Sequence, residues 1–258
     1  MSATEMQGTP PSGGIDPELQ LVLPGRGLPA GAGWGWVARG WALFARAPLM
    51  WIVSVVVLFV IAMVVSIIPF IGTLAFQLLQ AVFAGGFIMA CHALDKGGEF
   101  ELEHLFAGFS KRFVPLLIVG LLLMLGWIVI LLVFMAFVGL SILTAFMTGD
   151  ANADMTALAA SMGSMAIGVL VCAGLMVPLM AAYWFAPALV MMHDMAPVAA
   201  MKESFFACFR NFVPFLVYGL VMTVAALLAA IPFGLGFLVW LPVAIASTYV
   251  AYREIFTE

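Results

Sequence analysis

Residues 203–220 read ESFFACFRNFVPFLVYGL, and this stretch joins an amphipathic segment to the start of an apolar run. Phe205, Phe209 and Arg210 lie in the amphipathic part, and Pro214 stands where the apolar run begins. The same order of aromatic, basic and proline residues recurs as HLFAGFSKRFVPLLIVG at 104–120 and, in shorter form, as GWALFARAPL at 40–49. An internal repeat of this kind sets the architecture of a chain. The sequence therefore predicts three units of one design.

The composition indicates an integral membrane protein. Of 258 residues, 66% are apolar and only 9% are charged, and the mean hydropathy is +1.21. Soluble domains carry about 25% charged residues. The cysteines Cys91, Cys172 and Cys208 all lie in or beside apolar segments, which favours packing over a disulfide framework.

The expected fold is all-α, with six transmembrane helices arranged as three hairpins. Residues 1–32, rich in Pro, Gly and Ser, are expected to form a disordered tail, and 33–258 the membrane domain. Its units are 33–94, 100–192 and 197–252. In each unit an interfacial amphipathic helix precedes a hairpin of two spans of roughly 20 residues, the length that a bilayer requires. The three units imply a pseudo-threefold repeat.

Three segments show the periodicity of interfacial helices. In the first, the apolar side carries Trp34, Val37, Trp41 and Phe44, with Arg39 and Arg46 opposite. In the second, the apolar positions are Leu102, Leu105, Phe106, Phe109 and Phe113; in the third they are Val198, Met201, Phe205, Phe209 and Phe212. An aromatic face with basic residues opposite is typical of a helix lying in the lipid headgroup layer. Between the last two segments, Pro178 and Pro187 predict a kink in the fourth span.

The distribution of charge predicts the orientation. All nine Lys and Arg residues fall on one side of the six predicted spans, whereas the opposite turns carry only Asp150 and Asp154. By the positive-inside rule, both termini are expected to be cytoplasmic.

Few residues suggest chemistry. No Asp, Glu, Lys or Arg lies within a predicted span, which counts against a proton relay or a carboxylate-gated carrier. His92 and His193, near the ends of spans two and four, permit a haem or metal site but equally suit helix termini. Gln77 and Gln80 share one face of span two, where they either hydrogen-bond between helices or contact a solute. We therefore assign no catalytic, cofactor-binding or metal-binding residue and expect no cofactor.

Basic residues just before the span-opening prolines are the candidates for binding lipid headgroups. These candidates are Arg46, Lys111, Arg112 and Arg210. A cation at this position meets the lipid phosphates while the neighbouring aromatic side chains enter the acyl boundary. The alternative is that these residues only enforce the topology.

Three stretches carry a resemblance to a known family. They are LPAGAGWGW at 28–36, GWALFARAPLMW at 40–51 and WFAPALVMMHDMAPVAAMKESFFACFRNFVPFLVYG at 184–219. The chain resembles an uncharacterised family of proteobacterial inner-membrane proteins and, more loosely, the membrane domain fused to some glycerophosphodiester phosphodiesterases. The resemblance implies a six-helix inner-membrane protein and supplies no site residues.

The favoured function is a non-enzymatic membrane protein that binds lipid, a protein partner or a second copy of itself, with no nucleic-acid partner. One alternative is a transporter or channel for a neutral or amphiphilic solute, since internal repeats are common in transporters. The other is a redox or haem-associated subunit that uses His92 and His193.

Cysteine labelling tests the orientation. In a chain without its native cysteines, Asp150→Cys and Gly234→Cys should react with a membrane-impermeant thiol reagent applied outside spheroplasts. Gly98→Cys and Ala196→Cys should react only after lysis. Labelling of Gly98→Cys from outside would reverse the orientation.

Overall fold

The computed structural model describes residues 20–147 and 155–257, apart from the side chains of residues 141–142 and 144–161. These residues are helical except for loops and an isolated antiparallel bridge between Leu21 and Thr257, so the predicted all-α class is confirmed. In chain order the helices are α1 (Ala32–Arg46), α2 (Pro48–Val65), α3 (Ile71–Asp95), the 3-10 helix η2 (Leu102–Phe106), α4 (Ala107–Lys111), α5 (Phe113–Met147), α6 (Met155–Trp184), α7 (Ala186–His193), α8 (Pro197–Arg210), α9 (Phe212–Ala230) and α10 (Phe237–Phe256).

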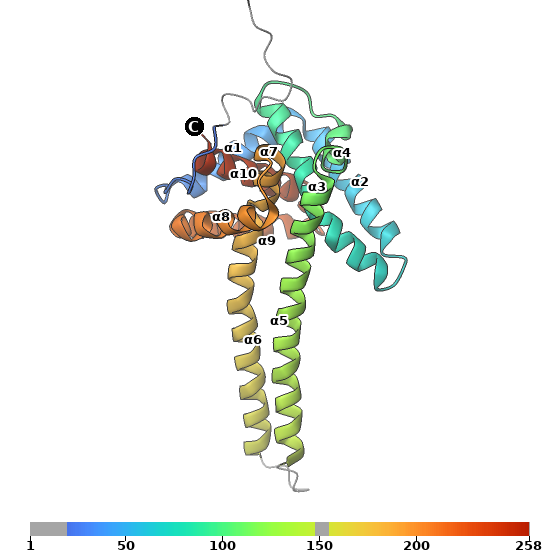
Figure 1. The fold of residues 1–258 in the computed structure, drawn as a ribbon, viewed down its shortest axis with the longest axis vertical. Helices are drawn as coiled ribbons and strands as arrows, with labels where there is room; N and C mark the ends of the chain where they lie inside the picture. Colours follow the sequence, from blue (N-terminus) through green and yellow to red (C-terminus); the bar gives the residue numbers. More distant parts are fainter. Residues whose placement is uncertain (1–19, 148–154, 258) are drawn as a thin grey trace, which may run out of the picture.

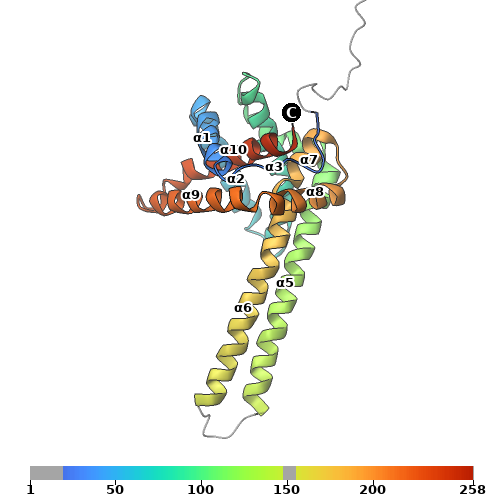
Figure 2. The same ribbon diagram turned by 90° about the vertical axis from the view of Figure 1, so that its left-hand side faces the viewer.

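Three helical hairpins, α2–α3, α5–α6 and α9–α10, leave a common base. Figure 1 shows α5–α6 extending far from the rest of the protein, with the shorter helices gathered around one end of it. The other two hairpins leave the base in different directions, as the perpendicular view in Figure 2 also shows. The C-terminus lies at the base, away from the tip of α5–α6.

A single residue separates each amphipathic helix from the hairpin that follows it. The separating residues are Ala47 after α1, Arg112 after α4 and Asn211 after α8. Their ψ values of 55°, 39° and 30° lie outside the α-helical range, so each helix ends there. Pro48 is then the first residue of α2, and Pro115 and Pro214 stand third in α5 and α9. Proline is tolerated in a first turn because the N–H it lacks has no intrahelical acceptor there.

Each amphipathic helix packs mainly against a hairpin other than the one it precedes. Helix α1 lies against α10 and α9, η2 and α4 lie against α3, and α8 lies against α6. The amphipathic helix of each unit therefore links its own hairpin to another, and the three links form a closed ring.

Small residues bring the backbones together at these links. A Cβ atom added to Gly40 of α1 would lie 2.3 Å from Ser247 Oγ of α10, and one on Gly86 of α3 would lie 2.2 Å from the carbonyl oxygen of Leu105. On α8 the buried Ser204 hydroxyl donates to the carbonyl oxygen of Ala181 at 2.7 Å and accepts the N–H of Phe185 at 2.9 Å. Larger side chains at these positions would push the helices apart.

Exposed aromatic side chains lie on the outer sides of α1 and α8. On α8 the buried residues are Ala200, Ser204 and Ala207, whereas Phe209 is 46% exposed. On α1 the helix buries Trp36, Gly40 and Leu43, among others. Trp34 and Trp41, at 61% and 54% exposure, lie on the outer side. The predicted apolar side of the first segment is thus mainly its outer side, and Phe44 is the predicted member that becomes buried.

The second amphipathic segment differs from its predicted form. The periodicity predicts one helix over 102–113, but the chain forms the 3-10 helix η2 and then the short helix α4. Glu101 and His104 cap the start of η2 reciprocally. Leu105 is fully buried at the contact with α3, while Phe106 remains exposed. Close packing of η2 on α3 therefore overrides the α-helical period.

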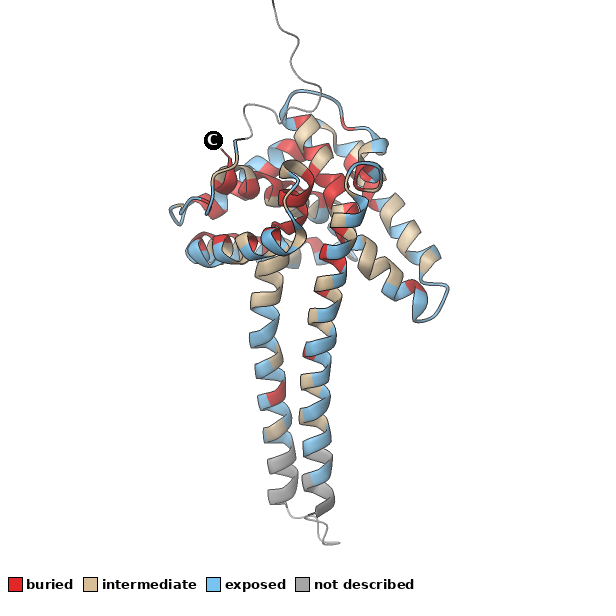
Figure 3. Ribbon diagram, in the orientation of Figure 1, coloured by how far each residue is buried: buried red, intermediate tan, exposed pale blue. Residues whose placement is uncertain are grey.

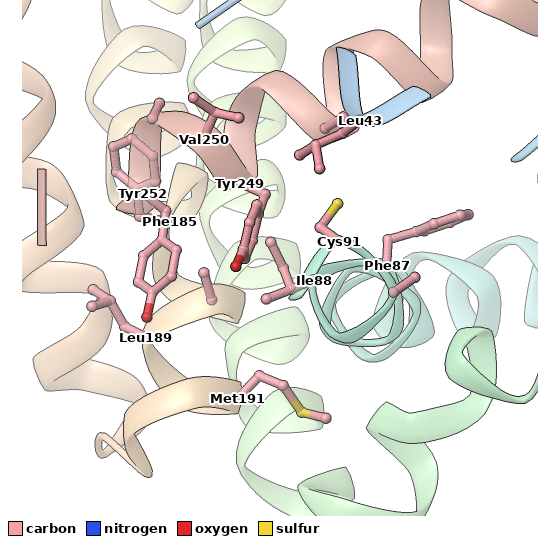
Figure 4. Close-up of a cluster of buried hydrophobic side chains, with 14 of the residues drawn as sticks. Leu43, Phe87, Ile88, Cys91, Phe185, Leu189, Met191, Tyr249, Val250 and Tyr252 are labelled. Atoms are coloured by element: carbon pink, nitrogen blue, oxygen red, sulfur yellow. The ribbon is translucent and has the colours of Figure 1, made fainter. Parts of the chain in front are cut away.

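The buried core lies in the base. Figure 3 shows buried residues concentrated there, whereas the long α5–α6 hairpin is mostly exposed or half-buried. Trp36, Trp51, Phe185, Tyr252 and Phe256 are fully buried. Figure 4 shows side chains from α1, α3, α7 and α10 converging in one part of this core. The exposed surfaces of the hairpins are apolar, as expected where lipid replaces water.

Five helical segments in the described residues are long and apolar enough to cross a membrane. They are Pro48–Val65, Ile71–Asp95, Phe113–Leu140, Met162–His193 and Phe212–Ala230. The sixth predicted span corresponds to α10, a helix of 20 residues that is not among the five. Its C-terminal half includes Ser247, Thr248, Arg253 and Glu254, and much of the helix is buried beneath its neighbours. In the fourth span, Pro178 stays within α6, and the helix ends at Trp184, before Pro187.

The close approach at Gly40 predicts a stability effect. Gly40→Val should lower the unfolding free energy by at least about 2 kcal/mol, because the added side chain meets α10. The matched control is Gly219→Val in α9, where an added Cβ has no neighbour within 4 Å; its effect should stay within about 0.5 kcal/mol beyond helix propensity. Titration with denaturing detergent in mixed micelles measures both, and equal losses would contradict the close α1–α10 contact.

Candidate functional site

A pocket at the base is lined by four of the nine basic residues of the chain. It has a volume of about 440 Å³. Its charged lining consists of Arg26, Arg39, Arg46, Arg253, Asp95 and Glu254. Four guanidinium groups thus face two carboxylates, which leaves an excess of two positive charges. We call this site the arginine pocket.

Three elements bring these residues together. Arg39 and Arg46 are seven residues apart on α1, so they lie on one side of the helix two turns apart. Arg253 lies in the last turn of α10, whose C-terminal end meets the end of α3. Arg26 belongs to the segment before α1, and its backbone N–H donates to the carbonyl oxygen of Ile255 at 2.8 Å.

The segment before α1 is therefore docked, although its composition predicts disorder. The N–H of Val22 donates to the carbonyl oxygen of Phe256 at 2.8 Å. Asn211, fully buried, accepts the N–H of Leu28 at 2.8 Å and donates to the carbonyl oxygen of Arg26 at 2.9 Å. These contacts hold residues 22–28 over the ends of α10 and α8.

The two carboxylates of the pocket are each paired with an arginine. Glu254 accepts from Arg39 and, at 2.8 Å, from the indole N–H of the buried Trp36. Asp95 pairs with Arg253 at 3.0 Å and accepts the Tyr249 hydroxyl at 3.1 Å. Each carboxylate is thus neutralised by one arginine.

The other two arginines bind backbone oxygens at helix ends. Arg26 donates to the carbonyl oxygen of Thr257 at 2.6 Å, and Arg46 donates to that of Leu94 at 2.5 Å. Neither forms an ion pair with another described residue. A guanidinium has five N–H donors, so both retain donors for an anion. Each guanidinium also interacts favourably with the partial negative charge at the C-terminal end of a helix, Arg26 with α10 and Arg46 with α3.

Only one of the four headgroup candidates chosen from the sequence lies in this pocket. Arg46 is that residue. Arg112 pairs with Asp194 at 2.5 Å, and Arg210 donates to the carbonyl oxygens of Pro24 and Gly25 at 2.7 and 2.6 Å. Lys111 is exposed at a separate acidic depression with Glu101 and Glu103. The four headgroup candidates are thus dispersed around the base.

Sequence reasoning missed Arg26, Arg39 and Arg253 as members of a site. The spacing of Arg39 and Arg46 is a readable signal, because seven residues place both side chains on one side of a helix. The contributions of Arg26 and Arg253 depend on contacts across the whole chain and have no local signal.

Each of the two noted histidines contacts a tyrosine of α10. The Nδ1 atom of His92 lies 3.2 Å from the Tyr249 hydroxyl, and the Nε2 atom of His193 lies 2.5 Å from that of Tyr252. Among the described residues, no group of three or more His, Cys, Asp or Glu side chains is arranged to hold a metal ion. The acidic stretch from Asp150 to Asp154 falls in a segment that the structure does not describe.

These features define an all-helical, multi-pass membrane protein with a cationic pocket at its base. The chain is 31% identical over 240 residues to a probable inner membrane protein of Burkholderia thailandensis, and the match covers 86% of this chain and 87% of that protein. The chain belongs to the family of that protein. No family model and no solved structure matches it.

The docked segment before α1 makes a proteolysis experiment informative. Asn211→Ala removes side-chain hydrogen bonds to Leu28 and Arg26, each worth roughly 0.5–1.5 kcal/mol, so cleavage by trypsin after Arg26 should accelerate at least about fivefold. Lys202→Gln, elsewhere on α8, should leave the rate unchanged. Mass spectrometry of the fragments measures it, and equal rates in both variants would contradict docking.

Proposed function

We propose that the protein is a non-enzymatic inner-membrane protein that binds anionic lipid headgroups at its cytoplasmic surface. The observation that carries this proposal is the excess of two positive charges in the arginine pocket, with unused guanidinium donors on Arg26 and Arg46. A basic residue near anionic lipid contributes about 1 kcal/mol, and planar guanidinium groups suit phosphate geometry.

The proposed topology has six spans, with α10 as the sixth and both termini in the cytoplasm. Helix α10 is long enough to cross, and its enclosure by α1, α2, α3 and α9 explains why it tolerates polar residues. This topology puts the arginine pocket on the cytoplasmic side, at the ends of α3 and α10. The absence of Lys and Arg from the opposite turns supports it.

The proposed organisation is three related units around an axis along the membrane normal. Its support is the ring of contacts in which α1, η2–α4 and α8 each pack on another unit's hairpin. The exposed aromatic side chains of α1 and α8 suit the headgroup layer, where Trp and Phe enter the acyl boundary.

Lipid analysis tests the pocket directly. The double variant Arg26→Gln/Arg46→Gln keeps both ion pairs of the pocket but removes its excess charge. Its affinity for anionic phospholipid should fall about 30-fold, corresponding to about 1 kcal/mol for each cation. The matched control Lys111→Gln/Lys202→Gln changes the net charge equally outside the pocket. Quantitative mass spectrometry of phospholipid retained in nanodiscs compares the two.

The headgroup candidates outside the pocket provide the opposing outcome. If Arg210→Gln and Lys111→Gln/Arg112→Gln lose anionic lipid while Arg26→Gln/Arg46→Gln retains it, the binding site lies at Lys111, Arg112 and Arg210 and the pocket assignment is wrong. Unchanged lipid in all of these variants would leave their cations with only a topological role.

A further inference from the structure

A second cavity lies within the hairpins, away from the arginine pocket. It has a volume of about 480 Å³, is lined by residues of α3, α5 and α6, and is open on one side. All three helices contain segments long and apolar enough to cross a membrane. Much of its lining is apolar, including Leu123, Met124 and Met180. Its size falls within the range of small-molecule sites, roughly 300–1,000 Å³.

Four polar side chains face this apolar space. Gln77 and Gln80 stand three residues apart on α3, Trp127 comes from α5 and Tyr183 from α6. None of these side chains hydrogen-bonds to another residue in the described part of the chain. The sequence offered interhelical hydrogen bonding as one role of the glutamines, and the structure does not provide it.

Polar groups at this depth need partners. An amide or hydroxyl within a membrane has no water to bind, so leaving it unpaired is costly. Because the side chains converge on one cavity from three helices, a single molecule there satisfies several of them at once. A cavity with several unpaired polar side chains has the composition expected of a ligand-binding site.

The lining chemistry restricts what such a molecule is. No Asp, Glu, Lys, Arg or His lines the cavity, so the ligand carries no charge. The carboxamides, the phenol and the indole offer N–H and O–H donors in excess of the acceptors supplied by the carboxamide oxygens. These donors suit carbonyl oxygens, and the Trp127 and Tyr183 rings suit a flat partner.

The route of entry is from the lipid. Leu74, Ile128 and Leu131 line the cavity and are 52%, 41% and 54% exposed on the apolar surface of the hairpins. A ligand that reaches the cavity across this surface must itself dissolve in the bilayer. We propose that the cavity between α3, α5 and α6 binds an uncharged, lipid-soluble ring bearing carbonyl oxygens, of the quinone class.

Photolabelling tests this site in the full chain. The protein is reconstituted in nanodiscs of neutral phospholipid with a photoreactive azidoquinone, and labelled peptides are mapped by mass spectrometry. Labels should concentrate on α3, α5 and α6 around the cavity, and excess decylubiquinone should abolish them. In Gln77→Leu/Gln80→Leu the labelling should fall at least tenfold. Leucine suits a span, so this variant should retain its thermal unfolding midpoint.

Two controls isolate the cavity. Thr223→Val makes a span less polar on α9, outside the cavity, and should label like the original chain. Arg26→Gln/Arg46→Gln should also label normally, so failure of the headgroup proposal would not affect this one. Labels spread over all hairpins, unchanged labelling in Gln77→Leu/Gln80→Leu, or equal displacement by a neutral diacylglycerol would overturn the quinone assignment.

Discussion

Close backbone contact between each amphipathic helix and a distant hairpin is the constraint on which the base of this protein depends. Inside a membrane, apolar surface gains little from being buried, because lipid is as apolar as a side chain. Tight van der Waals packing must then hold helices together, and it requires small residues such as Gly40 and Ser204 at the crossings. The ring of three such contacts gives the diverging hairpins one shared core.

The amphipathic helices use two faces for two purposes. Small residues and a few large anchors such as Trp36 attach them to the protein, while exposed aromatics such as Trp41 and Phe209 face outward. A helix of this type fixes the hairpins and at the same time presents aromatic rings on the outer surface of the protein. Its basic residues are divided as well, since Arg46 enters the arginine pocket and Arg210 secures the segment before α1.

The sequence predicted the helical elements well and the tertiary contacts poorly. Local rules suffice for Pro48, Pro115 and Pro214, because a proline after an amphipathic segment marks a helix start wherever it occurs. They fail for Arg26, since its docking depends on Asn211 and Ile255, about 185 and 229 residues further along the chain. Periodicity identified the aromatic side of α1 but not the second side, with Trp36, Gly40 and Leu43, that packs against the protein, because it does not separate a lipid-facing surface from a protein-facing one.

The ring of contacts has a consequence for biosynthesis. Helix α1 emerges from the ribosome early, yet its packing partners α9 and α10 are the last helices of the described chain. Until α9 and α10 are synthesised, no protein surface covers Trp36. The interfacial layer of the bilayer then stabilises α1, because an amphipathic helix buries its apolar side there. The arginine pocket needs α1, the segment before it and α10 together, so it is assembled only at the end of synthesis. An incompletely translated chain therefore lacks the arginine pocket.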